Sequence, residues 1–571
     1  MKKAKKLFTR LLVCVLSMAM LVSVTACNNS SSDNIDRGSE TTISIRSHKG
    51  GYGTTYLNKF KEKFETLYAE EGYKVQILTP SSDMQSTVAL QEMYSNDDWA
   101  DLYFTGAVTS EEGVAGDYGQ IFTDLTDLVW NKPAIDFNGE QESKPIKDKL
   151  NSNVPENIYT YNDKVYSMPL GVSLGGMIVN MEKLQKYGYT ELPRTSNELF
   201  EMFETIYKNT FDESSPMKQV YPLTYLGTQN GYHLHIQTVW LAQYMGVEGY
   251  DRFMGFTDEN GEWRLEDGYK AYEDPALDIL VENLYEMYDA MYAAPGTMRN
   301  DNSAAHAMIM ADNSGAVFMA EGDWAYNEIA VDYSEKINKV ALMNAPVISE
   351  LGVKLFGAGT SYNYSEEKCE EVLSWAVKQI DEGKTVAQIK TASEEKGYNL
   401  KDAEIERLQE ARGVYCDRSL QSSGIVICEK STKKDIAALF IRMFCSDDGS
   451  KLYNQETNGY SAYTQDFTQM KSNQFSQSYI KIRQNEKAHG VYLTVRELRK
   501  KISAGVGILP KDYFLAEKIT YQAVTAYDTK TGQMKPNGKE IYKTSAADLL
   551  KTEREYAATN WENWVKNISA N

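Results

Sequence analysis

The alternation of strand-like and helix-like segments after residue 40 constrains the fold more than any other feature. Residues 41–48 alternate apolar and polar side chains as a strand does, and residues 54–68 repeat aromatic and leucine residues at helical spacing. Further strands are expected at 73–80 and 99–107, with a helix at 86–96 between them. Strands that alternate with helices form a parallel sheet covered by helices. The sequence therefore predicts an α/β fold.

Ligands of open parallel sheets bind beyond the carboxyl ends of the strands. In this chain those ends lead into the loops at 47–54, 80–84 and 105–109. The chain of 571 residues also exceeds what one hydrophobic core normally holds, so two or more lobes are expected.

The first 27 residues have the pattern of an export signal. Five basic residues at 2, 3, 5, 6 and 10 precede an apolar run, Leu11–Val24, that is short for a membrane span. The run ends in VSVTAC, which resembles the lipobox of bacterial lipoproteins and implies acylation of Cys27. The alternative is an ordinary signal peptide with a chance cysteine. We expect a signal peptide at 1–26, a flexible tether at 27–40, and a lipid-anchored protein on the extracytoplasmic face of the cell membrane.

The charge balance argues against nucleic acid as a partner. The chain carries 60 basic and 80 acidic residues, a formal net charge of −20, and loss of the five basic residues of the leader makes this −25. The four cysteines beyond residue 27 form no CxxC pair and have no zinc-like spacing, so a disulfide is possible but not implied. No cofactor is predicted.

Three glycines, Gly171, Gly175 and Gly176, separate two apolar runs that read as strands. Glycine permits large backbone changes, so we interpret this stretch as a hinge where the chain passes from one lobe to another. The alternative is a tight turn between two strands of one domain.

The segment 165–206 resembles the extracellular solute-binding proteins, the family that includes maltodextrin-binding protein. In that family a strand ending in proline leads to a hinge, an NxxxLxxxG helix and a PxTxxEL helix start, all present here. Residues 315–329 (GAVFMAEGDWAYNEI) resemble the family's aMxxxGxW stretch, with Phe318 where a methionine usually stands. Residues 424–464 resemble its late strand, K-S-x-K-x-x-x-A helix and T-x-G run. Residues 365–415 depart from the pattern as an insertion.

The resemblance implies a two-lobed clamp in which hinge strands join the lobes. It implies an extracytoplasmic protein, expected as a monomer, that traps a solute, usually a carbohydrate, in the cleft and delivers it to the permease of an ABC transporter. The length of the chain and its 39 tyrosines favour an oligosaccharide over a monosaccharide. The membrane would be a partner only through the lipid anchor. The expected division is lobe 1 at 41–170, hinge and lobe 2 at 171–350, a return to lobe 1 at 351–470 with inserted helices at 365–415, and a C-terminal lobe 2 segment at 471–571.

A sugar-binding cleft needs aromatic rings for stacking and polar partners for hydroxyl groups. Trp324 matches the family's stacking tryptophan, although it could instead be buried under the second sheet, and Asp323 could accept hydroxyl hydrogen bonds. Trp240, within an apolar helix, is expected in the core. Further ligand-binding candidates are Tyr52, Ser82, Thr105 and Tyr362 from lobe 1 and Asn230, Tyr232 and His233 from lobe 2.

Other functions have weaker support. His233 and His235 could be two metal ligands, but no third is evident, and we predict no metal. A lipid-anchored glycoside hydrolase would need two carboxylates at a suitable distance. Among 80 acidic residues such pairs occur by chance, so the carboxylates neither support nor exclude this function. No GxSxG, HExxH or P-loop motif is present, so we predict a protein without enzymatic activity. A peptide-binding ABC importer subunit is the alternative within the same transport class.

Overall fold

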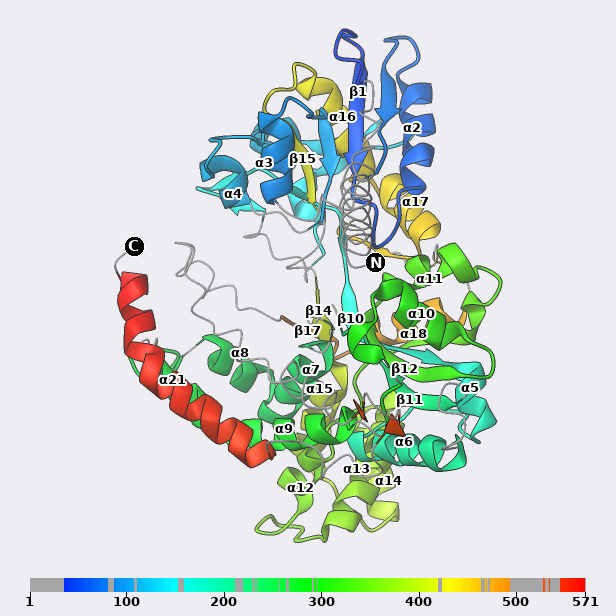
Figure 1. Ribbon diagram of the computed structural model, residues 1–571, viewed down its shortest axis with the longest axis vertical. Coiled ribbons are helices and arrows are strands. Elements are labelled where there is room, and N and C mark those ends of the chain that lie inside the picture. Colours follow the sequence, from blue (N-terminus) through cyan, green and yellow to red (C-terminus); the bar gives the residue numbers. More distant parts are fainter. Residues whose placement is uncertain are drawn as a thin grey trace, which may run out of the picture.

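The protein forms two lobes, each a sheet flanked by helices, in a computed structural model (Figure 1). This arrangement confirms the predicted two-lobed α/β fold. Lobe 1 comprises the described parts of 35–170 and 424–457. Lobe 2 comprises those of 174–418, 473–492 and 545–569. The structure describes residues 35–80, 87–106, 110–151, 159–210, 219–227, 232, 234–255, 257–262, 266–289, 292–294, 296–418, 424–463, 468, 470, 473–492, 527–528, 533–534 and 545–569.

The sheet of lobe 1 has the strand order β2-β1-β3-β15-β8. The first three strands are parallel, as their alternation with helices predicted, and β15 runs antiparallel to both β3 and β8. Strand β15, from the last third of the chain, therefore lies between β3 and β8, which both come from the first third. The five strands are β1 (Thr42–Ser47), β2 (Lys74–Ile77), β3 (Leu102–Phe104), β8 (Met168–Pro169) and β15 (Gly424–Ile427).

The helices of lobe 1 bury their aromatic residues against this sheet. Phe60 and Phe64 on the inner face of α2 are fully buried and meet Phe440 and Phe444 of α16 at ring-centroid distances of 4.8–6.4 Å. Such contacts between helices far apart in sequence join the two segments of lobe 1. Its helices and minor strands are α2 (Tyr56–Leu67), α3 (Thr87–Ser95), α4 (Ser110–Ala115), α16 (Lys434–Phe444), α17 (Asp447–Thr457), β4 (Pro133–Ile135), β5 (Gln141–Pro145), β6 (Thr160–Tyr161) and β7 (Lys164–Val165).

The sheet of lobe 2 has the order β11-β12-β10-β14-β17, and β13 pairs with β10 as well. All seven residues of β10 are buried, because helices cover both faces of the sheet. The six strands are β10 (Leu174–Asn180), β11 (Val220–Thr224), β12 (Gly315–Gly322), β13 (Val340–Met343), β14 (Val414–Asp417) and β17 (His489–Tyr492).

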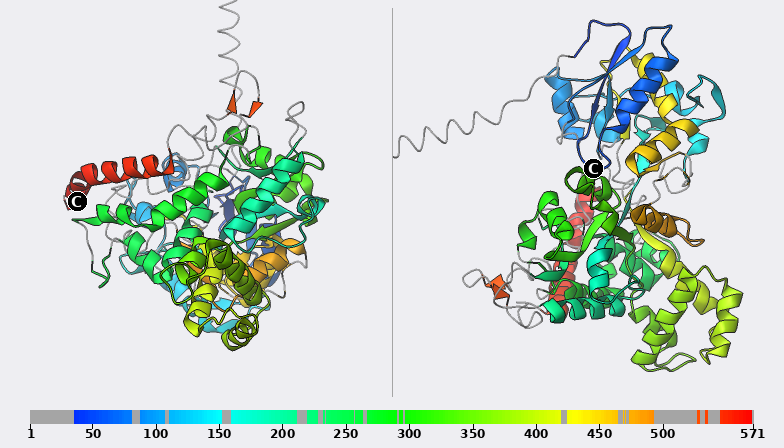
Figure 2. Two further views of the ribbon diagram at one scale, coloured as in Figure 1. Left: turned by 90° about the horizontal axis from the view of Figure 1, so that it is seen from below. Right: turned by 90° about the vertical axis from the view of Figure 1, so that its right-hand side faces the viewer.

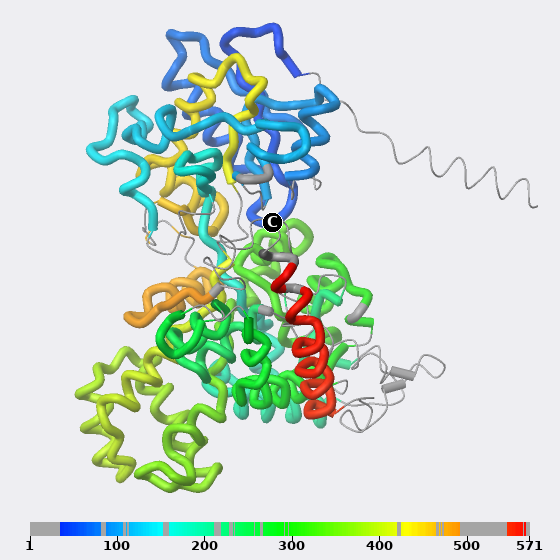
Figure 3. Tube along the Cα trace, turned by 90° about the vertical axis from the view of Figure 1, so that its left-hand side faces the viewer, coloured from blue at the N-terminus to red at the C-terminus, as the bar shows by residue number. Residues whose placement is uncertain are grey.

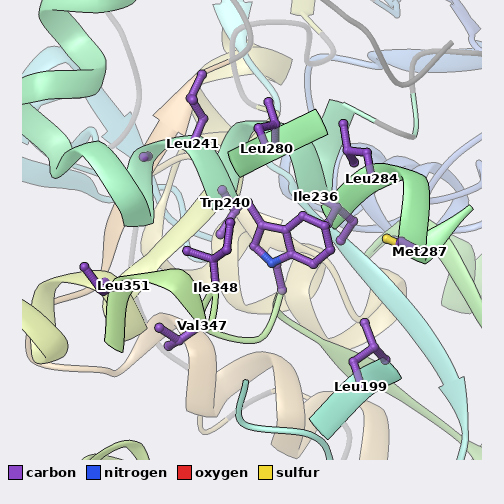
Figure 4. Packing of buried hydrophobic residues seen from close by; sticks show 14 of the residues in the cluster. Leu199, Ile236, Trp240, Leu241, Leu280, Leu284, Met287, Val347, Ile348 and Leu351 are labelled. Carbon is purple, nitrogen blue, oxygen red and sulfur yellow. The ribbon is translucent and has the colours of Figure 1, made fainter. Parts of the chain in front are cut away.

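Trp240 lies at the centre of the lobe 2 core (Figure 4). Its indole is fully buried, and its Nε1 donates to the Pro346 carbonyl over 3.0 Å. This confirms the prediction that Trp240 is a core residue. The helices around this sheet are α5 (Met181–Lys186), α6 (Ser196–Thr210), α7 (Leu234–Met245), α8 (Val247–Gly255), α9 (Ala276–Met287), α10 (Asn302–Met310), α11 (Ala325–Tyr333) and α18 (Gln474–Arg483).

The inserted helices belong to lobe 2, whereas the sequence placed 351–470 in the return to lobe 1. Figure 3 shows them at the end of lobe 2 farthest from lobe 1. Val372, Leu373 and Val377 of α13 are fully buried in the same cluster as Trp240, so the apolar face of this helix fixes the insertion there. The chain re-enters lobe 1 only at β15. The predicted insertion at 365–415 contains α13 (Glu366–Asp381), α14 (Val386–Glu395) and α15 (Asp402–Gly413), and α12 (Glu350–Phe356) precedes it.

The last helix, α21 (Ala546–Ser569), runs along the outside of lobe 2 (Figure 2). Arg554 on this helix pairs with Asp278 on α9 at 2.8 Å, and Leu549, Leu550 and Trp561 are buried. Two short strands, β18 (Tyr527–Asp528) and β19 (Gln533–Met534), pair with each other before it. Across the described residues, every helix is too short or too polar to pass through a lipid bilayer.

Within the described residues, three chain segments connect the lobes. The first runs from β8 in the sheet of lobe 1 to β10 in that of lobe 2, and the second from β14 to β15. The third runs from α17 through β16 (Tyr460–Ser461) to α18, and β16 pairs with β9 (Gly171–Val172) of the first segment. A single cluster of buried apolar residues continues from lobe 1 through this pair to the sheet of lobe 2.

Candidate functional site

Trp324 lies two residues beyond the end of β12 and directly precedes the first residue of α11. A Cβ atom at Gly322 would lie 2.1 Å from the indole, so only glycine lets the ring approach the strand backbone this closely. The indole Nε1 donates to Glu321 Oε1 over 3.0 Å. The side chain is half-buried, unlike that of Trp240. The Trp324 ring is therefore fixed by its packing on Gly322 and its hydrogen bond to Glu321, and part of its surface remains exposed to solvent.

An aromatic and cationic group surrounds this indole. The ring of Tyr232 lies 5.7 Å away, that of His235 meets it nearly edge-on at 5.9 Å, and the Arg418 guanidinium lies 5.8 Å from its centroid. Tyr232 is half-buried and His235 is fully buried. Burial, followed by the charge of Glu321, holds the pKa of Tyr232 well above its usual value, so the phenol stays protonated. Tyr232 and Arg418 therefore offer hydroxyl and guanidinium groups beside an apolar ring.

Asp323 joins the two lobes. Its buried carboxylate accepts the Tyr52 hydroxyl of lobe 1 at 2.9 and 3.0 Å and the main-chain N–H of Leu174 at 3.2 Å. The Tyr52 hydroxyl also lies 3.0 Å from Ser173 Oγ. Burial raises the pKa of Asp323 to about 7, while Leu174 and Tyr52 act in the opposite direction. The sequence assigned the Asp323 carboxylate to solute binding, but here it accepts hydrogen bonds from Tyr52 and Leu174 of the protein itself. These bonds make Asp323 a contact between the lobes.

The three predicted hinge glycines lie on the first crossing, Gly171 on β9 and Gly175 and Gly176 on β10. None of the three has a positive φ, so unusual backbone conformation is not their role in this state. A Cβ at Gly175 would lie 2.5 Å from the His235 ring, and one at Gly176 would lie 2.5 Å from the Met343 carbonyl oxygen. Close packing of neighbours therefore requires glycine here.

Two other candidates lie apart from Trp324. The hydroxyl of Thr105 is buried at the end of β3, within 2.9 Å of the Gly106 carbonyl and 3.2 Å of that of Gly424. Tyr362 is not on a lobe 1 loop. Its hydroxyl donates to Glu404 at 3.1 Å and its ring meets Phe356, so it packs within the inserted helices of lobe 2.

Four predicted residues fall outside the described part of the chain: Cys27, Ser82, Asn230 and His233. Of the nine ligand-binding candidates, the structure brings together Trp324, Asp323, Tyr52 and Tyr232.

Sequence reasoning missed several residues of this region. Glu321 is a fully buried carboxylate in the otherwise apolar strand β12, and that isolated charge was a usable signal. Arg418 follows β14 and reaches Trp324 from a segment nearly a hundred residues away, which no local pattern reveals. His306, Glu321 and Glu328 also form a group whose ligand atoms lie within 4.8 Å of one another.

A cavity of about 670 Å³ lies elsewhere in lobe 2. Residues from α13, α15 and α18 line it, among them the ion pair of Arg412 with Asp381, but Trp324, Asp323 and Tyr52 do not. Its lining is rich in paired charges and lacks an aromatic ring, so we do not assign the solute site there.

Comparison with known proteins identifies a family. Residues 56–481 match the family model described as bacterial extracellular solute-binding protein. The comparison with curated proteins gives no match.

Solved structures share the fold. A protein from work on xylan utilization by the thermophilic bacterium Caldanaerobius polysaccharolyticus has 14% identity and a TM-score of 0.53, covering 90% of this chain and 99% of that chain. Raffinose-bound RafE has 12% identity and a TM-score of 0.51, with the same coverage. Maltose-bound MalE3 of T. maritima has 14% identity and a TM-score of 0.51, covering 91% of this chain and 99% of that chain.

Proposed function

The chain belongs to the bacterial extracellular solute-binding protein family, and on that premise we propose that it binds a carbohydrate between its lobes. The observation that carries this proposal is the half-buried Trp324 ring, held by Gly322 and Glu321 at the junction of the lobes. Sugars present C–H groups on their faces and hydroxyls on their edges, so they bind aromatic rings flanked by polar groups. Tyr232 and Arg418 supply such groups here.

An oligosaccharide is the proposed class of solute. Structures that share the fold were solved with raffinose and with maltose, and one is a chitin oligosaccharide binding protein. The chain also contains 39 tyrosines, which suits a site that contacts several sugar rings.

The test is a titration of xylo-, malto-, raffinose-type and chitin oligosaccharides against wild type and two tryptophan variants. Trp324→Ala should weaken binding of the best sugar about 30-fold or more, since a stacking contact contributes about 2 to 4 kcal/mol and 1.4 kcal/mol is tenfold. Its free energy of unfolding should change much less than its affinity.

Trp99→Ala is the matched control. Trp99 is also half-buried, donates its Nε1 to the carboxylate of Asp97 at 2.8 Å, and has the Arg37 guanidinium over its ring, but it lies in lobe 1 outside the proposed site. Its sugar affinity should equal that of wild type. Equal affinities for Trp324→Ala and wild type would reject the stacking role, and binding of peptides in place of sugars would favour a peptide importer.

Ligand binding should close the lobes about the three crossings. We propose that the Gly171–Gly176 stretch takes part in this motion, because the first crossing runs through it. Small-angle scattering should then give the mass of a monomer and a smaller radius of gyration with saturating sugar than without. An unchanged radius would argue against a closing clamp.

Membrane attachment and transport complete the proposal. We propose that Cys27 is acylated, that the protein stays on the extracytoplasmic face of the membrane, and that it delivers the solute to an ABC permease. Cys27→Ser should release the exported chain into the soluble fraction, because the tether carries no other apolar segment. Retention of this variant in washed membranes would contradict the anchor.

A further inference from the structure

Three potential metal ligands meet next to Trp324, whose indole donates a hydrogen bond to one of them, Glu321. His306 comes from α10, Glu321 from the end of β12, and Glu328 from α11. One ligand atom of each lies within 4.8 Å of the other two. His306 and Glu321 are buried, and Glu328 is half-buried.

The atoms that face each other in this group are unsatisfied. Among the described residues, neither His306 Nε2 nor Glu321 Oε2 has a hydrogen-bond partner, although both are buried. They lie 3.4 Å apart, beyond the roughly 2.7–3.2 Å of a good N–H···O bond. A fully buried carboxylate oxygen without a hydrogen bond is costly unless something else neutralises it.

The remaining oxygens are already engaged, and this fixes the carboxylates. Glu321 Oε1 accepts the Trp324 indole N–H at 3.0 Å. Glu328 Oε1 accepts the main-chain N–H of Gly51 at 2.8 Å, and its Oε2 accepts the Asn302 amide at 3.0 Å. Hydrogen bonds of this kind orient the first ligands of a metal site in proteins.

We propose that His306, Glu321 and Glu328 bind one divalent transition-metal ion of the Zn²⁺ type. Zn²⁺ binds histidine nitrogen and carboxylate oxygen at about 2.0–2.2 Å, and in a tetrahedral site two such ligands stand about 3.4 Å apart. This agrees with the distance between His306 Nε2 and Glu321 Oε2. The imidazole favours Zn²⁺ over Mg²⁺ or Ca²⁺, which prefer oxygen alone.

A bound cation would also relieve a charge conflict. The carboxylates of Glu321 and Glu328 lie close together, and Glu321 is fully buried, so their like charges repel each other with little screening by water. A divalent ion would neutralise both carboxylates and tie α10, β12 and α11 together. Because Glu321 accepts the indole N–H of Trp324 and Glu328 accepts the main-chain N–H of Gly51, the ion would also fix the indole and the lobe 1 loop that contains Gly51.

The test uses the purified full chain after removal of metal with a chelator and needs no sugar, so it is independent of the proposed solute. Titration with Zn²⁺ should give one ion bound per chain and a higher melting temperature. Co²⁺ in its place should give the visible absorption bands of a low-symmetry, tetrahedral-type site. Absence of stoichiometric Zn²⁺ binding and of the Co²⁺ bands would overturn the proposal and leave only a buried contact between His306 and Glu321.

Variants locate the ion. Glu321→Gln keeps an acceptor for Trp324 but removes the anionic ligand, and His306→Gln removes the nitrogen ligand. Changes in the outer-shell partners of metal ligands weaken metal binding about tenfold to a hundredfold. Loss of a ligand itself should weaken Zn²⁺ binding by at least that much in each variant. His489→Gln, at an exposed histidine on β17, is the matched control and should bind as wild type does. Equal weakening in the control, or none in either ligand variant, would overturn the assignment.

Discussion

Trp240 and Trp324 both belong to lobe 2, but Trp240 has the surroundings of a core residue and Trp324 those of a binding-site residue. Trp240 is fully buried among aliphatic side chains and its single polar atom is satisfied by the Pro346 carbonyl. Trp324 is half-buried, and the groups around it include Arg418, Glu321 and His235. The first region consists of closely packed side chains, whereas in the second burial raises the pKa of Glu321 and lowers that of Arg418. Such groups gather at functional sites more often than in ordinary cores.

The largest expected effect is on the core side of this comparison. Trp240→Ala should lower the free energy of unfolding by about 3 to 5 kcal/mol, because it leaves a cavity that the surrounding helices cannot fill. It also leaves the Pro346 carbonyl without its donor. Chemical denaturation of this variant beside Trp324→Ala measures the contrast. Equal losses of stability in the two variants would mean that Trp324 is a core residue as well.

The second prediction concerns the pH dependence that Asp323 imposes. Its pKa is about 7 in the folded state and about 3.9 in an unfolded chain, so the unfolded form ionises first as the pH rises. The stability associated with the protonated carboxyl is complete below about pH 4 and is lost as the pH rises to about 7. A pKa difference of this size corresponds to at most about 4 kcal/mol.

Asp323→Asn isolates that contribution. The amide oxygen can still accept from Tyr52 and Leu174, but the side chain no longer ionises. The stability of Asp323→Asn relative to wild type should therefore increase between pH 4 and pH 7.5 in denaturation experiments. Arg483 opposes the effect, since its charge favours the ionised form of Asp323. Parallel pH profiles for the two proteins would show that Asp323 ionises normally.

A smaller effect is expected at Gly175, where the site and the crossing strand meet. A methyl group in Gly175→Ala would lie about 2.5 Å from the His235 ring and force it to move, at a cost of about 1 to 3 kcal/mol. Gly255→Ala, at the end of α8, is the control, because its nearest neighbour would lie 3.8 Å away. Its stability should be unchanged or slightly higher. Similar values for the two variants would refute close packing at Gly175.

The smallest effect should come from Tyr52→Phe. This change removes the hydroxyl that links lobe 1 to Asp323 but leaves the Leu174 N–H in place. The loss should be about 1 kcal/mol, the typical contribution of one hydrogen bond. Because Tyr52 stabilises the ionised carboxylate, the pKa of Asp323 should also rise, and the pH profile of unfolding reports this. An unchanged profile would show that the hydroxyl does not support the carboxylate.

The sequence predicted the regular parts of the fold better than their assembly. The alternation of β1, α2, β2, α3 and β3 could be read locally, since each element carries its own periodicity. The insertion at α13–α15 was recognised as helical but was assigned to the wrong lobe. Which lobe covers an amphipathic helix depends on the apolar surface that other segments expose, and that surface is not encoded nearby.

The residues of the candidate site could likewise be predicted better than the contacts between them. Trp324, Asp323, Tyr52 and Tyr232 could be named from their loops and from the resemblance, but the use of Asp323 by Tyr52 could not. Tyr362 was misplaced because the loop before α13 reads the same whether it faces a cleft or a neighbouring helix. His306, Glu328 and Arg418 carried no local signal of their meeting with Glu321 or Trp324.

The sequence by itself determined that strands and helices alternate in at least two lobes and that a tryptophan follows a buried strand. These features follow from residue periodicity and from local backbone preferences, which act over a few residues. Only the tertiary structure decided that the buried Glu321 faces His306, that Asp323 binds lobe 1, and that the glycines of the crossing serve close packing. Burial and the spacing of charges arise when distant segments pack together, and these set the cost of each polar group.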